Sequence, residues 1–367
     1  MNNILAERIL VKLMEWTQEE IDRERPLIQA LANLKYDGYQ QYSTGMRFTE
    51  SLVNWLNQFA NAIERNVAYD FIKANLIFIS SEQVTHLINI CFSEKIDPHL
   101  TAKTAKEMEI SGHLITKIHN ANEYSTIKRS SLFLGLSDGA KIDQLRRSSS
   151  IDNEQIFSSY YISKEKQVDM LEKLSAAVGV NAKFSSVFLI DDFTASGLSY
   201  FRQSEEKGKI LKFLKLLYKD KSEEDSNARL DELIDIENLS LHIIFYVARS
   251  SALEYLKTAI GEWQTLTGNQ FEFSVSAIQV IHLDVTEKVL GEVDFGKLLA
   301  NDAYFDPSIL DSHYEVGKVT TPYLGFNECA LPLVLHHNTP NNSLPILWLP
   351  TDKKFTGLFP RVTRHKE

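Results

Sequence analysis

The sequence has little cysteine. Only two of its 367 residues, Cys91 and Cys329, carry a thiol. Two cysteines cannot build the disulfide framework that stabilises small secreted domains. We therefore expect a protein of a reducing compartment and place it in the cytoplasm.

Long apolar runs and an excess of basic charge are also missing. No apolar stretch approaches the roughly 20 residues of a membrane span. Residues 1–16 carry Glu7, Arg8 and Lys12 inside an apolar pattern that is typical of an amphipathic helix and not of a signal peptide. The formal net charge is −10 at pH 7, which argues against general nucleic-acid binding. We expect partners other than membranes and nucleic acids.

Two familiar site motifs are absent as well. The chain lacks the signature Gly-x-x-x-x-Gly-Lys-Ser/Thr, which excludes a P-loop NTPase. A metal cluster of His313, Cys329, His336, His337 and Asn338 is the alternative interpretation of the C-terminal histidines. Adjacent histidines on a strand point in opposite directions, and no Cys-x-x-Cys or His-x-x-x-His pair is present. We therefore predict no metal site built from protein side chains.

The most informative stretch is residues 187–199. It opens with four apolar residues, Val-Phe-Leu-Ile, which is typical of a parallel strand covered on both faces. Asp191 and Asp192 follow and are predicted to end the strand, where the ligand crevice of an open α/β sheet lies. A loop of small residues then leads toward a helix start, whose N–H groups can bind an anion. The loop residues are Thr194, Ala195, Ser196, Gly197, Leu198 and Ser199. The alternative is a plain helix start with acidic residues near its dipole.

This order of groups suits a phosphorylated pentose. Vicinal hydroxyls donate to carboxylates, and a phosphate accepts from N–H and O–H groups. The stretch resembles the signature of type I phosphoribosyltransferases. The resemblance implies that Asp191 and Asp192 are the catalytic pair on the ribose hydroxyls and that residues 194–199 hold the 5-phosphate. Phe188, Phe193 and the single glycine depart from the family pattern.

A second candidate loop follows a predicted strand at 131–136. Its residues are Ser137, Asp138, Gly139 and Ala140, with the cations Lys141, Arg146 and Arg147 after it. By the same resemblance this loop contacts the pyrophosphate, and cations of this kind neutralise such a group. A plain turn with a solvated basic face is the alternative interpretation.

From residue 130 onward, predicted strands alternate with helices. Strands are expected near residues 132, 187, 242 and 278, with helices at 164–178, 200–218 and 252–266 and a polar loop at 221–233. This pattern predicts an α/β fold with a phosphoribosyltransferase-like, doubly wound parallel sheet. We expect three parts: a mainly helical N-terminal region at 1–125, the α/β core at 126–290 and a C-terminal hood at 291–367.

The tail contains an unusual polar loop, His-Asn-Thr-Pro-Asn-Asn-Ser-Leu-Pro at residues 337–345. Together with Gly-Met-Arg-Phe at 45–48, it resembles phosphoribosyltransferase-like proteins encoded in bacterial conflict and antiphage islands. A hood over the crevice selects the acceptor in type I enzymes, so the resemblance implies that His337 and Asn338 contact a ligand. It also implies an antiviral role beside a partner protein of a defence operon.

Two functions follow from these patterns. The first is a pentosyltransferase of the phosphoribosyltransferase type, with Mg²⁺ held mainly through the ligand's oxygens. Such chemistry rests on positioning and on stabilising the leaving pyrophosphate, so no catalytic histidine is required. The alternative is an inactive module that senses phosphoribosyl pyrophosphate or a nucleotide and regulates a partner effector.

Overall fold

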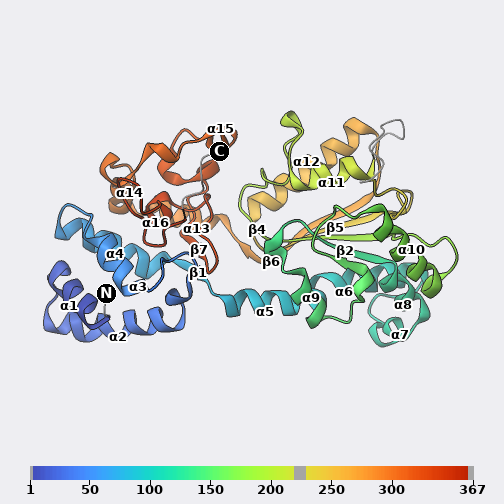
Figure 1. The fold of residues 1–367 in the computed structure, drawn as a ribbon, viewed down its shortest axis with the longest axis horizontal. Coiled ribbons are helices and arrows are strands. Elements are labelled where there is room, and N and C mark those ends of the chain that lie inside the picture. The colour runs from blue at the N-terminus through green and yellow to red at the C-terminus, as the bar shows by residue number, and fades with distance from the viewer. Residues whose placement is uncertain (1–2, 219–228, 363–367) are drawn as a thin grey trace. The chain divides into compact units, whose positions relative to one another are not determined.

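The computed structural model describes residues 3–218 and 229–362, and its contacts divide the chain into two compact units (Figure 1). One unit is continuous, Thr85–Ile281, and the other joins Met1–Val84 to His282–Glu367. These boundaries differ from the three parts expected at 1–125, 126–290 and 291–367, because the two ends of the chain share one hydrophobic core. Much of the expected loop at 221–233 lies outside the described residues.

The continuous unit is built on a five-stranded parallel sheet with the order β3-β2-β4-β5-β6. The strands are β2 (Ser131–Gly135), β3 (Ile156–Phe157), β4 (Ser186–Thr194), β5 (Ser240–Arg249) and β6 (Glu272–Ile281). Counted along this unit, the order is 2-1-3-4-5, that of a doubly wound sheet. The predicted α/β class and parallel sheet are therefore confirmed.

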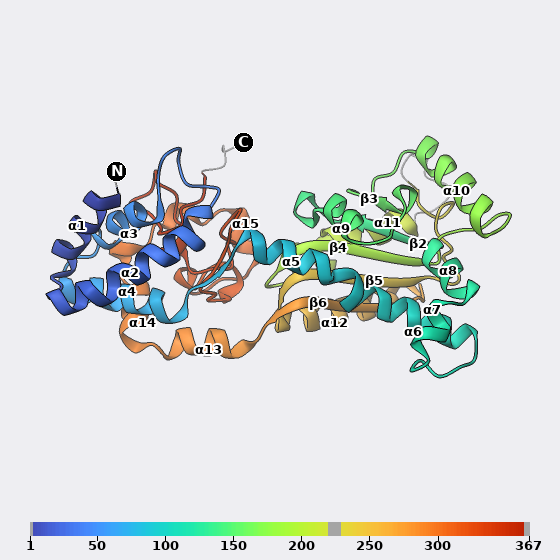
Figure 2. The ribbon, with the colours of Figure 1, turned by 90° about the horizontal axis from the view of Figure 1, so that it is seen from below.

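Helices cover both faces of this sheet. One face packs its alternating apolar residues, such as Leu134, Leu189 and Ile243, against α10, α11 and α12. The chain reaches the other face through α5 and α6 (Figures 1 and 2). The helices of this unit are α5 (Ser81–Cys91), α6 (Asp97–Glu107), α7 (Ile115–His119), α8 (Asn122–Arg129), α9 (Ile142–Ser148), α10 (Lys164–Val178), α11 (Lys209–Leu217) and α12 (Ser250–Thr267). α10 begins as predicted, because the Ser163 hydroxyl accepts from the Lys166 N–H at 3.4 Å.

Two predicted boundaries are wrong. β4 does not end before Asp191 but continues through both aspartates to Thr194, because the ten-residue strand β5 pairs with it as far as Ala248. The helix expected at 200–218 begins only at Lys209. Gly208 has φ +124° before it, and a Cβ there would lie 2.3 Å from the Tyr200 carbonyl oxygen. The chain therefore turns back on itself before the helix can start.

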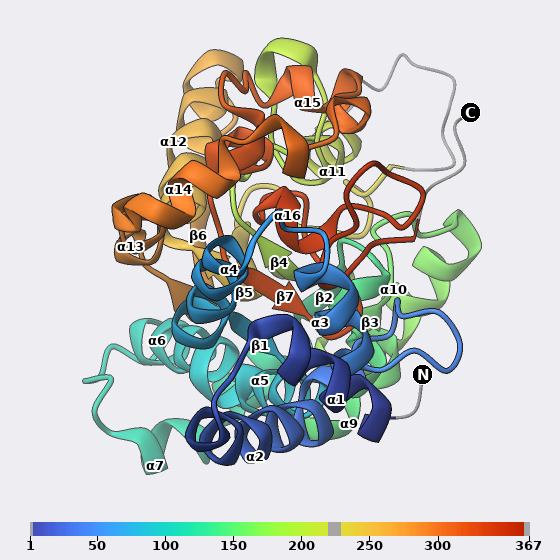
Figure 3. The same ribbon diagram turned by 90° about the vertical axis from the view of Figure 1, so that its left-hand side faces the viewer.

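The second unit combines both ends of the chain (Figure 3). The Trp55 indole donates to the Ile346 carbonyl at 2.9 Å, and the rings of Phe71 and Phe295 stack at 3.5 Å. β1 (Ile77–Ile79) pairs in parallel with β7 (Leu333–Leu335). The helices of this unit are α1 (Asn3–Met14), α2 (Gln18–Leu34), α3 (Phe48–Leu56), α4 (Ala62–Asn75), α13 (Leu283–Gly291), α14 (Val293–Leu299), α15 (Ser312–Val316) and α16 (Pro345–Trp348).

Within the described ranges, every helix is too short or too polar to cross a membrane.

A row of rings crosses the second face of the large sheet. Register places Phe133, Phe188, His242 and Ser274 side by side on β2, β4, β5 and β6. His242 stacks on Phe188 at 4.8 Å and on His99 of α6 at 4.0 Å. Its Nδ1 lies 2.9 Å from the Ser274 hydroxyl. Burial, followed by the neighbouring His99 and Lys103, lowers the pKa of His242 to about 3.

His242 should make folding sensitive to acid. In the unfolded chain it takes up a proton near pH 6.5, whereas in the fold it stays neutral until about pH 3. Stability is then lost as the pH falls through this window, by up to about 1.4 kcal/mol per pH unit. We expect urea unfolding of His242→Phe to depend less on pH between these limits than that of the wild type. The exposed His113→Phe serves as the control, and parallel pH curves for wild type and His242→Phe would contradict this account.

Candidate functional site

The loop after β2 and the acidic end of β4 meet at one edge of the large sheet. Gly135 pairs with Ile190, and the Leu136 N–H donates to the Ile190 carbonyl at 2.9 Å. The chain leaves β2 toward β3 on one side and β4 toward β5 on the other. This edge is therefore the topological switch point, where open α/β sheets bind ligands.

Asp191 is completely buried at this edge, with 0% of its side chain exposed. Its carboxylate accepts from the Ser137 hydroxyl, from the Tyr200 hydroxyl at 2.9 Å and from Lys209 Nζ at 2.7 Å. The Asp192 N–H donates to it as well, at 3.1 Å. Burial and the charge of Asp192 raise the pKa of Asp191, while Lys209 and Ser137 oppose that rise. The carboxylate is thus already matched by donors of its own chain.

Asp192 lies on the other side of the strand. Successive side chains of a strand point to opposite faces, so the two aspartates cannot present the same surface to a ligand. The Phe193 N–H donates to Asp192 Oδ1 at 2.8 Å. A Cβ on Gly139 would lie 2.6 Å from the Asp192 Cγ and 2.7 Å from its Oδ2. The carboxylate of Asp192 therefore sits directly against the loop after β2.

The loop after β2 is fixed by a hydrogen bond from β5. The Tyr246 hydroxyl of β5 donates to the Ala140 carbonyl at 2.7 Å. The Asp138–Ala140 turn then passes into Lys141, which has φ +43°, a conformation that costs free energy for a residue with a Cβ. Lys141 forms no ion pair within the described part of the chain. It is the cation of this loop that is open to an anionic ligand.

The two arginines predicted to join this loop are engaged elsewhere. Arg147 pairs with Asp143 of its own helix at 2.8 Å, and both side chains are largely exposed. Arg146 donates to the Asn153 side chain at 2.5 Å. These contacts are typical of side chains on a solvated helix face and not of side chains in a pyrophosphate site.

The loop at 194–199 is partly closed by its own hydrogen bonds. The Thr194 hydroxyl accepts from the Gly197 N–H at 3.2 Å, and the Ser196 hydroxyl accepts from the Leu198 N–H at 3.4 Å. Gly197 has φ +77°, and a Cβ there would lie 2.6 Å from the Tyr255 ring. Within the described residues, no acceptor is found for the N–H groups of Ala195, Ser196 and Ser199. These three N–H groups are the backbone donors that the loop can offer an anion.

The start of α11 does not supply the additional N–H groups that the sequence suggested. The Lys209 N–H donates to the Ser199 carbonyl at 3.2 Å, and the Ile210 N–H donates to the Tyr200 carbonyl at 3.0 Å. The loop therefore covers the helix start that was expected to face a phosphate.

Three residues of this site were missed from the sequence. Lys209 pairs with Asp191, and only 33% of its side chain is exposed. Tyr200 and Tyr246 reach the site from a turn and from the neighbouring strand. Nothing in their local sequence distinguishes them, because their roles depend on strand register and on the turn before α11.

Residues 135–139 also have the spacing Gly-x-Ser-x-Gly of a nucleophile elbow. An elbow serine sits in a strained turn directly between strand and helix. Ser137 instead has extended backbone angles, φ −159° and ψ 176°, and its hydroxyl donates to Asp191. This serine anchors the buried carboxylate and is not arranged as a hydrolase nucleophile.

His337 and Asn338 belong to the other unit. They form a tight turn after β7, in which the Asn338 N–H donates to the Leu335 carbonyl at 3.0 Å. Gln41 Nε2 donates to the His337 carbonyl at 3.0 Å and to Asn338 Oδ1 at 3.1 Å. This turn is therefore tied to the N-terminal part of the chain. Across residues 3–218 and 229–362, no three His, Cys, Asp or Glu side chains are grouped to hold a metal ion.

The family model PRTase-CE, where PRTase abbreviates phosphoribosyltransferase, matches residues 52–361, which is most of the chain. No curated protein and no solved structure matches the chain.

The ion pair between Lys209 and Asp191 should stabilise the edge of the sheet. Removing one partner of a buried ion pair leaves an uncompensated charge, but solvent screens part of this cost because a third of the Lys209 side chain is exposed. We therefore expect Lys209→Met to lower the free energy of unfolding by up to about 3 kcal/mol at pH 8. This loss of stability should become smaller in acid. Without Lys209 the pKa of Asp191 rises further, so its carboxyl group takes up a proton more readily and then needs no cation. Urea unfolding at pH 8 and pH 5 measures this.

Lys212→Met is the matched control, since Lys212 is an exposed lysine of the same helix. It should change the free energy of unfolding by less than about 0.5 kcal/mol. Equal effects of the two substitutions would show that the pair contributes nothing.

Proposed function

The chain belongs to the PRTase-CE family, a phosphoribosyltransferase-like family. On that basis we propose that it binds phosphoribosyl pyrophosphate or a nucleotide, together with Mg²⁺, at the carboxyl edge of the large sheet. The observation that carries the proposal is the contact between Gly139 and Asp192 beside the loop at 194–199. A carboxylate and two loops with free donors thus meet at the switch point.

Each group has a distinct role in this proposal. Asp192 accepts from the ribose hydroxyls, while Asp191 holds the surrounding segments in place. The N–H groups of Ala195, Ser196 and Ser199 bind the 5-phosphate, and Lys141 with the 137–140 loop faces the pyrophosphate. This binding does not require Arg146, Arg147, His337 or Asn338.

The donors present fit Mg²⁺. Its preferred ligands are hard oxygens, commonly one or two carboxylates together with the phosphates of a substrate. Asp192 offers such a carboxylate, and the ligand's own oxygens would complete the coordination. Bound there, Mg²⁺ would stabilise the charge that develops on a leaving pyrophosphate.

Two alternatives remain for this function. The protein transfers the phosphoribosyl group, or it senses the ligand without transferring it. The transferase form needs mainly positioning of the reacting groups, which the strand end and the loop would supply. The sensing form is favoured by Asp191, because its four donors from within the chain leave a ligand only one accessible aspartate. In either form we propose a role in bacterial antiphage defence beside a partner protein, in accord with the resemblance of the tail.

Calorimetry and a pyrophosphate assay separate these forms. We expect phosphoribosyl pyrophosphate to bind in the presence of Mg²⁺, and Asp192→Asn to weaken binding by about tenfold or more, which is about 1.4 kcal/mol. The exposed Asp70→Asn in the other unit should leave the affinity unchanged. Pyrophosphate release with a panel of bases identifies a transferase, and binding without release identifies a sensor. If neither this ligand nor nucleotides bind, the proposal is wrong.

Gly139→Ala tests the geometry of the site without changing any charge. The new methyl group would lie within 3 Å of the Asp192 carboxylate, so the side chain or the loop must move. We expect about a tenfold loss of affinity for the same ligand. Gly112→Ala is the control, because a Cβ there would meet nothing within 4 Å. An unchanged affinity of Gly139→Ala would show that the ligand does not use this contact.

A further inference from the structure

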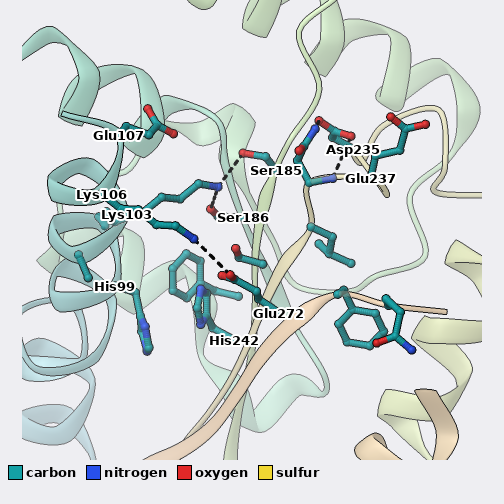
Figure 4. A pocket seen from close by; sticks show the side chains of 18 residues that line it. His99, Lys103, Lys106, Glu107, Ser185, Ser186, Asp235, Glu237, His242 and Glu272 are labelled. Carbon is teal, nitrogen blue, oxygen red and sulfur yellow. Dashed lines mark hydrogen bonds and ion pairs between the residues drawn. The ribbon is translucent and has the colours of Figure 1, made fainter. Parts of the chain in front are cut away.

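A cavity of about 1040 Å³ lies at the amino ends of β4, β5 and β6 and under α6 (Figure 4). Because the strands are parallel, this edge is opposite the edge that carries Asp191 and Asp192. Neither the family pattern nor the proposed function makes use of it.

Lys103 is the central cation of this cavity. Its Nζ donates to the Ser185 hydroxyl at 3.1 Å and to the Ser186 hydroxyl at 3.0 Å. Burial lowers the pKa of Lys103, although Glu107, Glu272 and Asp235 oppose this at longer range. Among the residues that the structure describes, no carboxylate lies within 4.0 Å of this ammonium group.

The lysine and its two serines form a donor set. A lysine has three N–H donors, of which the serines take two. Each serine hydroxyl accepts from Lys103 and keeps its own hydrogen for another acceptor. Three donors therefore converge at the amino end of β4, where a carboxylate would satisfy them.

The lining as a whole carries more negative than positive charge. Four carboxylates line the cavity, those of Glu107, Asp235, Glu237 and Glu272, against two lysines. Lys106 lies 3.5 Å from Glu272, so that pair is largely self-compensated. Figure 4 shows Asp235 and Glu237 beyond Ser185 as seen from Lys103. A dianion such as phosphate is disfavoured by this excess of negative charge, whereas an ammonium group is favoured.

The remaining wall contains two neighbouring rings, those of His99 and His242, whose centroids lie 4.0 Å apart. The lowered pKa of about 3 keeps the His242 ring neutral at pH 7. Such a wall accommodates an apolar or aromatic side chain.

We propose that this cavity binds a small zwitterion of the amino-acid class. Its carboxylate accepts from Lys103, Ser185 and Ser186, its ammonium group donates to Asp235 and Glu237, and its side chain packs along His99 and His242. This site is independent of the proposed function at the opposite edge.

Ligand-observed NMR on the full chain tests the site. The probes are the standard amino acids, with acetate and methylamine as the two separate halves of the ligand. We expect at least one amino acid to bind at millimolar or lower concentration and both halves to bind at least about tenfold more weakly. No binding by any amino acid, or equal binding of acetate, overturns the proposal.

Variants locate the binding within the chain. Lys103→Met should lower the affinity for the identified amino acid by about tenfold or more. Lys106→Met, which removes the neighbouring exposed lysine, should change this affinity by less than about threefold. Asp235→Asn keeps the shape of its side chain and should also weaken binding, so it serves if Lys103→Met does not fold. Unchanged affinity in whichever of these two variants folds places the ligand elsewhere and overturns the assignment.

Discussion

The carboxyl edge of the large sheet depends on the buried carboxylate of Asp191. A charge without water is costly unless donors surround it, and here a serine, a tyrosine, a lysine and a backbone N–H do so. These donors come from the loop after β2, from the turn before α11 and from α11 itself. One side chain thereby joins three segments that are separate in sequence. The shape of the candidate site follows from this network.

The same network divides the acidic pair into two roles. Strand pleating sends Asp191 beneath α11 and Asp192 toward Gly139. In a loop, both carboxylates could turn to one ligand, but β4 continues through them and prevents this. The carboxylate of Asp192 therefore lies beside the loop after β2, while that of Asp191 lies on the opposite face of the strand. This arrangement accounts for an acidic pair whose members differ so strongly in burial.

The two edges of the sheet offer different chemistry. At the carboxyl edge, free N–H groups and Lys141 accompany one accessible aspartate, which suits a phosphorylated sugar. At the amino edge, Lys103 is held by two serines and carboxylates line the rest of the cavity, which suits a ligand carrying both charges. Parallel strands keep these two edges apart by the length of the sheet. Binding at one edge therefore does not exclude binding at the other.

Much of the fold could be read from local pattern. The apolar runs at 131–136, 187–190 and 241–248 predicted three central strands, and the helix expected at 164–178 is α10. The sequence also identified the two loops that meet at the candidate site. It could not show that β4 extends to Thr194, because that depends on the length of its neighbour β5. Nor could it show that the early helices and the C-terminal tail share one core, since such contacts span most of the chain.

The sequence by itself determined the α/β class, the parallel strands and the position of the acidic pair, because apolar periodicity and turn residues act over a few neighbouring residues. Tertiary structure alone decided that Lys209, Tyr200 and Ser137 neutralise Asp191, and that Lys103 is held by two serines rather than by a carboxylate. These pairings depend on strand register and on the path of the loops. Both arise only when the whole sheet is packed.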